Sequence, residues 1–322
     1  MSLPSTVRAV RFKENPIITP ALLGAAGHAN INGPSLIRVP SWVQKPLGKY
    51  YLYFADHGGK HIKLAYADDL HGPWKIHEGG TLQLMQATGC TSHIASPDVV
   101  IDEPNKQIRM YYHGVTKGSG QKTFVALSAD GLNFTTNDTI LAEFYLRVWR
   151  WDGMWYGMAK GGELYRSKDG LTPFEKGSNP LDDGQLRKPP FNTAGPRHVA
   201  LDLRGSTLWV YYSSIGDEPE HILRCRLELV GDWKSWRAAD VQSILKPEME
   251  YEGARLPLKP SIGGAASGLE NALRDPAIFC EDGHVYLLYS VAGENGIAIA
   301  EMVETVAHTT GLPIMPAQEH KR

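Results

Sequence analysis

Two aspartates, Asp98 and Asp275, each stand beside a proline at the start of a short apolar run, in SPDVV and RDPAIF. Charged groups beside an apolar strand cost free energy unless they are ion-paired or used in binding or catalysis. Similar runs begin in NGPSLI, EFYLRVW and GPRHVA and add further polar side chains. We therefore expect either an ion-paired plug or a polar ligand site where these starts meet. The candidate residues at the starts are Asn32, Asp98, Glu143, Arg147, Arg197, His198, Arg274 and Asp275.

Two histidines and one glutamate outside these starts extend the candidate set. His57 in FADHGGKH and His93 in TSHIASPD flank the same runs, and histidine titrates near neutral pH. They serve either as acid–base groups or as polar side chains satisfied within the fold. Glu252 belongs to a linker, residues 246–271, that is too long for a plain turn. Glu252 therefore lies either over the ligand site or in solvent.

The elements that must position these residues form an internal repeat. Helical periodicity is nearly absent, and short alternating or apolar runs are separated by Gly, Pro, Asn and Asp, which is typical of β-strands. Five units of up to four strands predict an all-β fold, a single-domain five-bladed β-propeller over residues 1–322. A β-sandwich and a β-helix are the alternatives. The predicted blades span residues 33–80, 95–140, 141–178, 193–245 and 272–302.

The fifth predicted blade lacks an outer strand, and the N-terminal STVRAVRFKE can supply it. This pairing closes the ring and removes most of the exposed sheet edges. The innermost strand of each blade lines the central channel, so the starts of these strands converge at one end of the axis. The polar residues at the starts are therefore expected to form one site.

Composition and simple motifs argue against several classes of function. With 33 basic and 35 acidic residues the net charge is −2, so we expect no nucleic-acid partner. The apolar runs fall short of the ~18 residues of a membrane span, and no basic start precedes an apolar core, so we expect no membrane association and a cytoplasmic location. DxDxDG and phosphate-loop glycine motifs do not occur, so we expect no cofactor and name no metal ligand. The sequence leaves open whether a metal is bound on the axis. The sequence leaves the oligomeric state open.

The layout resembles the five-bladed glycoside hydrolases of family 43 and the related invertase-like family 32. SPDVVIDEPNKQIRMYYHG is similar to the second-blade motif of family 43, and LRDPAIF to the Arg-Asp-Pro motif of the invertase group. The resemblance implies that Asp98 orients the general acid and tunes its pKa, and that Asp275 binds sugar hydroxyls. AEFYLRVWRWDGMWYGMAKGGELYRS follows the outline of the third blade, which makes Glu143 the general acid by position.

The first blade departs from the family pattern. Family 43 begins this blade with an Asp-Pro whose Asp is the general base, whereas this chain has Gly33 before Pro34 and Asn32 before Gly33. Glycine has no side chain, and asparagine does not accept a proton as a carboxylate does. Either another pair of carboxylates, drawn also from Glu252 and Glu270, or a histidine replaces this base, or the chain does not catalyse.

The expected function is a glycoside hydrolase that acts on a terminal glycosidic bond of a short glycan or glycoside, with carbohydrate as its partner. Asp98, Asp275 and Glu143 are the predicted catalytic residues. The alternatives are a non-catalytic carbohydrate-binding propeller and a glycoside phosphorylase in which Arg197 and Arg274 cradle phosphate. The predicted substrate-binding residues are Asn32, His57, His93, Arg147, Arg197, His198, Glu252 and Arg274.

Overall fold

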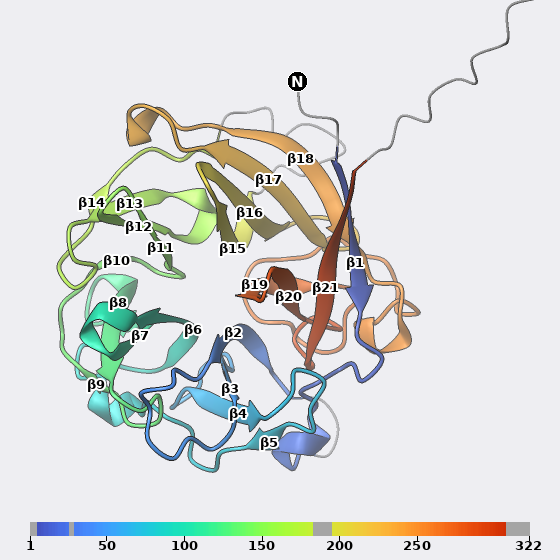
Figure 1. Ribbon diagram of the computed structural model, residues 1–322. Helices are drawn as coiled ribbons and strands as arrows, with labels where there is room; N and C mark the ends of the chain where they lie inside the picture. Colours follow the sequence, from blue (N-terminus) through green and yellow to red (C-terminus); the bar gives the residue numbers. More distant parts are fainter. Residues whose placement is uncertain (1–4, 26–28, 183–194, 307–322) are drawn as a thin grey trace, which may run out of the picture.

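Five antiparallel sheets surround a central axis in the computed structural model, which describes residues 5–25, 29–182 and 195–306 (Figure 1). This arrangement confirms the predicted five-bladed β-propeller. Among the described residues, no helix is long and apolar enough to cross a bilayer. The first two sheets contain β2 (Asn32–Arg38), β3 (Tyr50–Ala55), β4 (Lys63–Ala67) and β5 (Lys75–Ile76), then β6 (Ile94–Asp102), β7 (Gln107–Thr116), β8 (Gly120–Ser128), β9 (Thr135–Thr136) and β10 (Ala142–Glu143).

The other three sheets complete the ring. The third and fourth contain β11 (Arg147–Trp151), β12 (Met154–Met158), β13 (Leu164–Ser167) and β14 (Glu175–Lys176), then β15 (Pro196–Arg204), β16 (Thr207–Ser214), β17 (Ile222–Glu228) and β18 (Ala238–Leu245). The fifth contains β19 (Arg274–Glu281), β20 (His284–Ser290), β21 (Ile297–Val306) and β1 (Ser5–Arg11). Short 3-10 helices connect the strands: η1 (Ala21–Leu23), η2 (Leu84–Gln86), η3 (Glu103–Asn105), η4 (Lys160–Gly162), η5 (Trp233–Ser235) and η6 (Glu250–Glu252).

The second sheet extends further along the chain than its predicted blade. β10 pairs with β8, Ala142 opposite Thr123 and Glu143 opposite Lys122. The third sheet therefore begins at Arg147, although the sequence pattern placed the start of that blade at residue 141. The predicted start of the fourth blade, residue 193, lies outside the described residues.

The fifth sheet joins the two ends of the chain. β1 runs antiparallel to β21, from Ser5 opposite Val306 to Arg11 opposite Ala300, and the two strands lie side by side at the rim of the ring (Figure 1). The Arg11 guanidinium then reaches Glu252 in η6, with Nε to Oε1 at 2.7 Å. This ion pair fixes the N-terminal strand against the linker that precedes the fifth blade.

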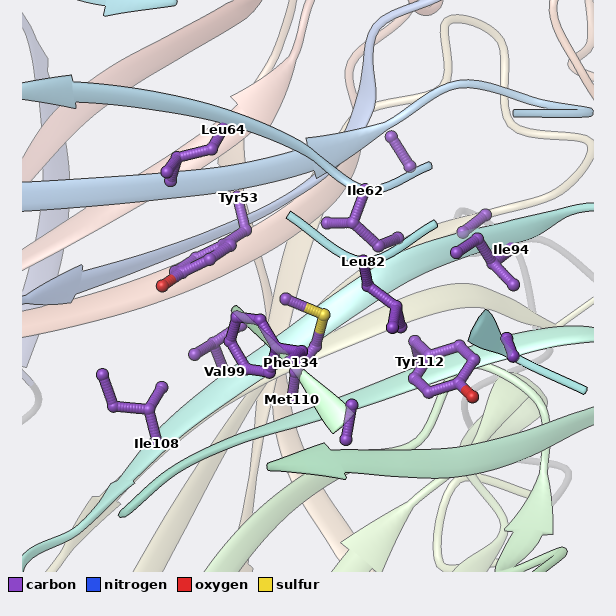
Figure 2. Close-up of a cluster of buried hydrophobic side chains, with 14 of the residues drawn as sticks. Tyr53, Ile62, Leu64, Leu82, Ile94, Val99, Ile108, Met110, Tyr112 and Phe134 are labelled. Atoms are coloured by element: carbon purple, nitrogen blue, oxygen red, sulfur yellow. The ribbon is translucent and has the colours of Figure 1, made fainter. Parts of the chain in front are cut away.

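The apolar core sits between adjacent blades. Every residue of β3 is buried, because each blade is covered by a neighbour on both faces. Figure 2 shows the interface of the first two blades, where Tyr53 and Leu64 lie opposite Val99 and Met110. Aromatic and branched side chains fill the spaces between the sheets. The polar side chains of the inner strands therefore lie near the axis.

Each inner strand opens with a residue in the left-handed backbone region. These residues are Gly33, Ser96, Tyr145, Gly195 and Asp275, with φ of 58°, 47°, 61°, 86° and 50°. A proline follows in every blade except the third. In those four blades the register with the neighbouring strand also shifts at this point, as at a β-bulge. Bulges re-aim side chains, so the first residues of these strands face the axis instead of following the regular alternation.

Candidate functional site

A cavity of about 110 Å³, here called the mouth cavity, lies among the starts of the inner strands. Pockets for drug-sized ligands measure ~300–1,000 Å³, so this one suits a single small polar molecule. Asn32, Arg197 and His198 come from the inner strands, as the sequence predicted for their positions. The lining residues are Asn32, His57, His93, Ala95, Ser96, His113, Gln121, Phe144, Tyr145, Lys160, Arg197, His198, Gly264 and Glu294.

The second strand of each blade also delivers one polar residue to this end of the axis. In an antiparallel sheet the end of the second strand lies beside the start of the first. The residues at or just after the end of each second strand therefore lie at the same end of the axis as the starts of the inner strands. They follow β3, β12, β16 and β20, and in the second blade the residue lies within β7. The residues that they bring are His57, His113, Lys160, Glu220 and Glu294.

His57 and Glu294 form a paired imidazole and carboxylate at the edge of the cavity. Nδ1 of His57 lies 3.0 Å from Oε2 of Glu294, and its Nε2 has no hydrogen-bond partner among the described residues. Asn30 donates to the same carboxylate oxygen, and Arg274 lies 3.4 Å from the other. Burial alone would raise the pKa of Glu294, but the hydrogen bonds and charges of His57, Asn30 and Arg274 outweigh it and lower that pKa to about 2. The carboxylate is therefore ionised and holds the imidazole in one orientation.

A second imidazole and carboxylate pair lies under the cavity wall. Nδ1 of His198 contacts Oδ1 of the fully buried Asp275, and Ser290 donates to Oδ2 of Asp275 at 3.2 Å. The centre of the His198 ring lies 3.9 Å from the centre of the Tyr145 ring. Burial, and after it the charges of Arg197 and Arg147, lower the pKa of His198 well below 6.5. This histidine is therefore neutral at pH 7.

Aromatic rings and His113 close another side of the mouth cavity. His113 is buried, and the centre of its ring lies 4.3 Å from that of Tyr145 and 5.9 Å from that of His93. Its Nδ1 has no hydrogen-bond partner among the described residues. Burial and the neighbouring His93 and His57 lower the pKa of His113 well below 6.5, while burial and Glu294 raise the pKa of Tyr145 to about 12. At neutral pH the cavity thus presents a neutral imidazole and a protonated phenol.

Lys160 in η4 brings a cationic side chain to the cavity. Its Nζ lies 4.9 Å from the centre of the Phe144 ring and 6.0 Å from that of Tyr145. No ion pair to a carboxylate links it to any described residue. Desolvation, and after it the positive charge of Arg197, lower the pKa of Lys160.

Arg197 and Arg274 are held by buried carboxylates. Glu220 accepts from Nε of Arg197 at 2.8 Å and from Nε of Arg274 at 2.8 Å, while Nη2 of Arg274 reaches Glu270 at 2.5 Å. Arg197 also donates to the carbonyl oxygens of Ile262 and Gly264. The two guanidinium groups support the floor of the site and are not free to cradle a phosphate.

Asp98 and Arg147 lie one level deeper on the axis. They line an inner cavity, about 150 Å³, with residues of all five inner strands. Nη1 of Arg147 is 3.4 Å from Oδ1 of Asp98, and the Val148 N–H donates to Oδ2 at 2.8 Å. Burial raises the pKa of Asp98 against the opposing effects of Arg147 and Val148. Asp98 thus lines the inner cavity, whereas Asp275 supports the wall of the mouth cavity.

Two predicted site residues lie away from both cavities. Glu143 is in β10 at the margin of the second sheet, where its carboxylate pairs with Lys122. Glu252 is fully buried between Arg11 and Tyr289, whose hydroxyl donates to it at 2.9 Å, so it does not reach over the axis. The position in the third blade that faces the mouth cavity belongs to Phe144 and Tyr145.

Sequence reasoning missed the carboxylate that does line the mouth cavity, Glu294. It also missed Glu220, Lys160, His113 and Tyr145. The available signal was the second strand of each repeat, because FADH, YYHG, MAKGG, GDEPE and AGEN occupy matching places. Among the described residues, no group of three or more His, Cys, Asp or Glu side chains is placed to hold a metal ion.

The fold is a five-bladed propeller of the kind found in glycoside hydrolase family 43. A calcium-free β-xylosidase/α-arabinofuranosidase of that family from a compost microbial metagenome, in complex with xylotriose, is 13% identical with a TM-score of 0.60, covering 92% of this chain and 94% of that one. A thermostable family-43 glycoside hydrolase is 14% identical with a TM-score of 0.59, covering 92% and 98%. At these identities the likeness is one of fold.

A sequence relative fixes the family more narrowly. The chain is 38% identical over 319 residues to the uncharacterized protein R118 of Acanthamoeba polyphaga mimivirus, across 91% of this chain and 90% of that protein. The chain belongs to the same family as R118. No protein-family profile matches it.

Proposed function

We propose that the protein hydrolyses a terminal glycosidic bond of a short glycan or glycoside, with the terminal sugar bound in the mouth cavity. The observation that carries this proposal is the His57–Glu294 pair, in which Nε2 of His57, at the edge of the cavity, has no partner among the described residues. Support also comes from the fold, which is shared with β-xylosidases, an α-arabinofuranosidase and arabinanases. A small cavity at the end of an axis suits the end of a glycan better than its middle.

His57 is assigned the proton transfers of the reaction. With the Nδ1 proton donated to Glu294, the lone pair on Nε2 accepts a proton from the water that attacks the anomeric carbon. As the bond from that carbon to the leaving oxygen breaks, the Tyr145 hydroxyl gives its proton to the leaving oxygen. The pKa of Tyr145, about 12, keeps this proton in place until then. The ionised Glu294 stabilises positive charge on His57 and on the sugar ring.

The predicted aspartates keep supporting roles in this scheme. Asp275 positions His198 in the cavity wall, and Asp98 balances Arg147 beneath the inner-strand starts. Glu143 is paired with Lys122, and Glu252 is paired with Arg11. Neither glutamate has a catalytic role in this proposal. A phosphorylase is not favoured, because Glu220 accepts hydrogen bonds from the guanidinium groups of Arg197 and Arg274 that a phosphate would need.

A non-catalytic carbohydrate-binding propeller is the second candidate. The observation that favours it is that Glu294 is the single carboxylate among the described residues that line the mouth cavity. Glycosidases of the usual kind use two carboxyl groups about 5–9.5 Å apart. Binding without turnover is the outcome that this candidate predicts.

The test is a panel of 4-nitrophenyl furanosides and pyranosides with wild type and His57→Asn. General acid–base catalysis contributes about 10²- to 10⁴-fold, so His57→Asn should lower kcat/KM by that factor while calorimetry still detects sugar binding. The matched control is His284→Asn, which removes an exposed histidine paired with Glu301 at 2.6 Å and should change kcat/KM less than twofold. Sugar binding without any turnover by wild type establishes the binding propeller instead.

A further inference from the structure

The mouth cavity has a cation, Lys160, that no carboxylate of the described residues neutralises. Lys160 lines the cavity, is half-buried, and has only the faces of Phe144 and Tyr145 beside its ammonium group among the described residues. Withdrawing an ammonium group from water costs free energy unless a partner replaces the water. A cation–π contact recovers about 0.5–2 kcal/mol, which offsets part of this cost. The remaining donors of Lys160 are available to a ligand.

The other charges around the cavity are matched within the protein. Arg197 and Arg274 face Glu220, Glu270 and Glu294, and Lys259 lies 3.6 Å from Glu270. These groups balance, three cations against three carboxylates. Asp275 is covered by His198 and Ser290 and does not line the cavity. Glu294, the carboxylate among the described lining residues, is already engaged by His57, Asn30 and Arg274. The charge on Lys160 therefore has no carboxylate of its own among the described residues, and the positive charge of Arg197 adds to it.

Two buried imidazole nitrogens point to the same kind of occupant. Nδ1 of His113 and Nε2 of His198 have no hydrogen-bond partner among the described residues, and both histidines line the cavity. Buried polar atoms are nearly always paired, so each unpaired one calls for a ligand or water. A neutral imidazole can donate one N–H to an oxygen atom of a bound group. Because the neutral His198 turns its Nδ1 proton to Asp275, its Nε2 accepts and does not donate. Lys160, and His113 when its proton is on Nδ1, are therefore the donors toward the cavity.

We propose that the sugar in the mouth cavity carries an anionic group, a carboxylate, phosphate or sulfate, and that Lys160 binds this group. The inference rests on the proposed function for the presence of a sugar, but it concerns the charge of that sugar. The uncompensated Lys160 carries it, and Nδ1 of His113 supports it. An acidic sugar satisfies groups that a neutral sugar leaves unpaired.

The experiment compares matched neutral and acidic ligands by calorimetry, and turnover is measured separately. The pairs are galactose with galacturonate, glucose with glucuronate, glucose with glucose 6-phosphate, and N-acetylglucosamine with its 6-sulfate. Wild type should bind one acidic member at least tenfold more tightly than its neutral partner, since a hydrogen bond to a charged group is worth that factor or more. The pair that shows the preference identifies the anion.

Variants assign the preference to Lys160. Lys160→Gln should weaken binding of the acidic ligand at least tenfold and that of the neutral ligand less than threefold, while Lys160→Arg keeps most of the preference. The control is Lys176→Gln, which removes the same charge from the same blade at an exposed pair with Glu163. Raising the salt concentration should also weaken acidic ligands selectively.

Each result bears on one of the two proposals. Equal affinity for neutral and acidic sugars, or equal losses for both in Lys160→Gln, overturns the assignment to Lys160 even if neutral aryl glycosides are hydrolysed. Acidic sugars bound selectively without turnover of 4-nitrophenyl glucuronide or galacturonide leave the anion site in place and remove the hydrolase proposal. Failure of every sugar to bind overturns both.

Discussion

At the scale of single residues, burial sets the protonation of the site. His113 and His198 are held neutral because they are withdrawn from water beside arginines and other histidines. Glu294 is held ionised because His57, Asn30 and Arg274 surround it. Opposite effects on neighbouring groups are typical of functional sites, where one group must give a proton and another must stay charged.

The neutral histidines predict how stability depends on pH. Their folded-state pKa values lie below 6.5, so below about pH 6.5 the unfolded chain binds more protons than the folded protein. The free energy of unfolding should therefore fall as pH drops from 6.5 toward 5, by at most about 1.4 kcal/mol per pH unit for each histidine. His113→Asn should make this fall less steep, as measured by urea unfolding at pH 7.5, 6.5 and 5.5.

A matched histidine on the surface controls for this effect. His284 is exposed, so His284→Asn should leave the slope of unfolding free energy against pH unchanged. Burial lowers the pKa of His61 and His221 as well, so part of the slope persists in His113→Asn. An identical slope in wild type and His113→Asn would show that His113 is not kept neutral by the fold.

At the scale of elements, the start of the inner strand is the unit that builds the site. Its first residue is left-handed in every blade, and the side chains that follow are aimed at the axis. Ser96, Tyr145 and Asp275 show that residues with side chains occupy this conformation in three blades. Gly33 is the equivalent residue of the first blade, so the missing carboxylate is a change of side chain at a conserved place in the repeat.

Gly33 is constrained by more than its backbone angle. A Cβ at this position would lie 3.0 Å from Cα of Ser96 and 3.2 Å from its Oγ. Gly33→Ala should therefore destabilise the protein by more than the ~1–2 kcal/mol cost of a left-handed non-glycine residue. Gly58→Ala measures that cost alone, because Gly58 has φ of 73° and open space around its Cβ. Equal losses of unfolding free energy in the two variants would rule out the steric contact with Ser96.

The sequence predicted the strands well because their signal is local. Alternation and turn residues defined the blades, and the five-bladed propeller is confirmed. Polar strand starts predicted the positions of Asn32, Arg197 and His198. Lys160 and Glu294 were missed because they follow second strands, whose ends meet the same site only once the ring exists. Glu252 was misplaced because its partner, Arg11, lies 241 residues away, and no local pattern reveals such a pair.

At the scale of the whole molecule, the ring depends on a contact between distant segments. Arg11 of β1 binds Glu252 through Nε and Nη2, and Glu252 is fully buried with additional bonds from Tyr289 and the backbone of residues 248 and 249. Removing one partner of a buried ion pair leaves the other charge without compensation. The stability of the closed ring should therefore be sensitive to this pair.

Arg11→Met tests the contact while keeping a long apolar side chain. Breaking a buried ion pair costs about 3–5 kcal/mol, so the free energy of unfolding should fall by roughly 3 kcal/mol in urea titrations. Arg38→Met is the control, since it breaks an exposed pair with Glu281 of the same 2.7 Å length and should cost about 1 kcal/mol or less. Similar small losses for both variants would mean that Arg11 does not secure the ring.

The pairing of β1 with β21 also sets the order in which the molecule can be completed. During synthesis β1 waits for a much later part of the chain, because its partner β21 comprises residues 297–306. Until then the first strand and the edge of the last blade are both open to other chains. The pairing of β1 with β21 closes a loop that contains the rest of the propeller, and contacts at such sequence separations form slowly. The strand that closes the finished ring thus leaves two unpaired edges on the nascent chain.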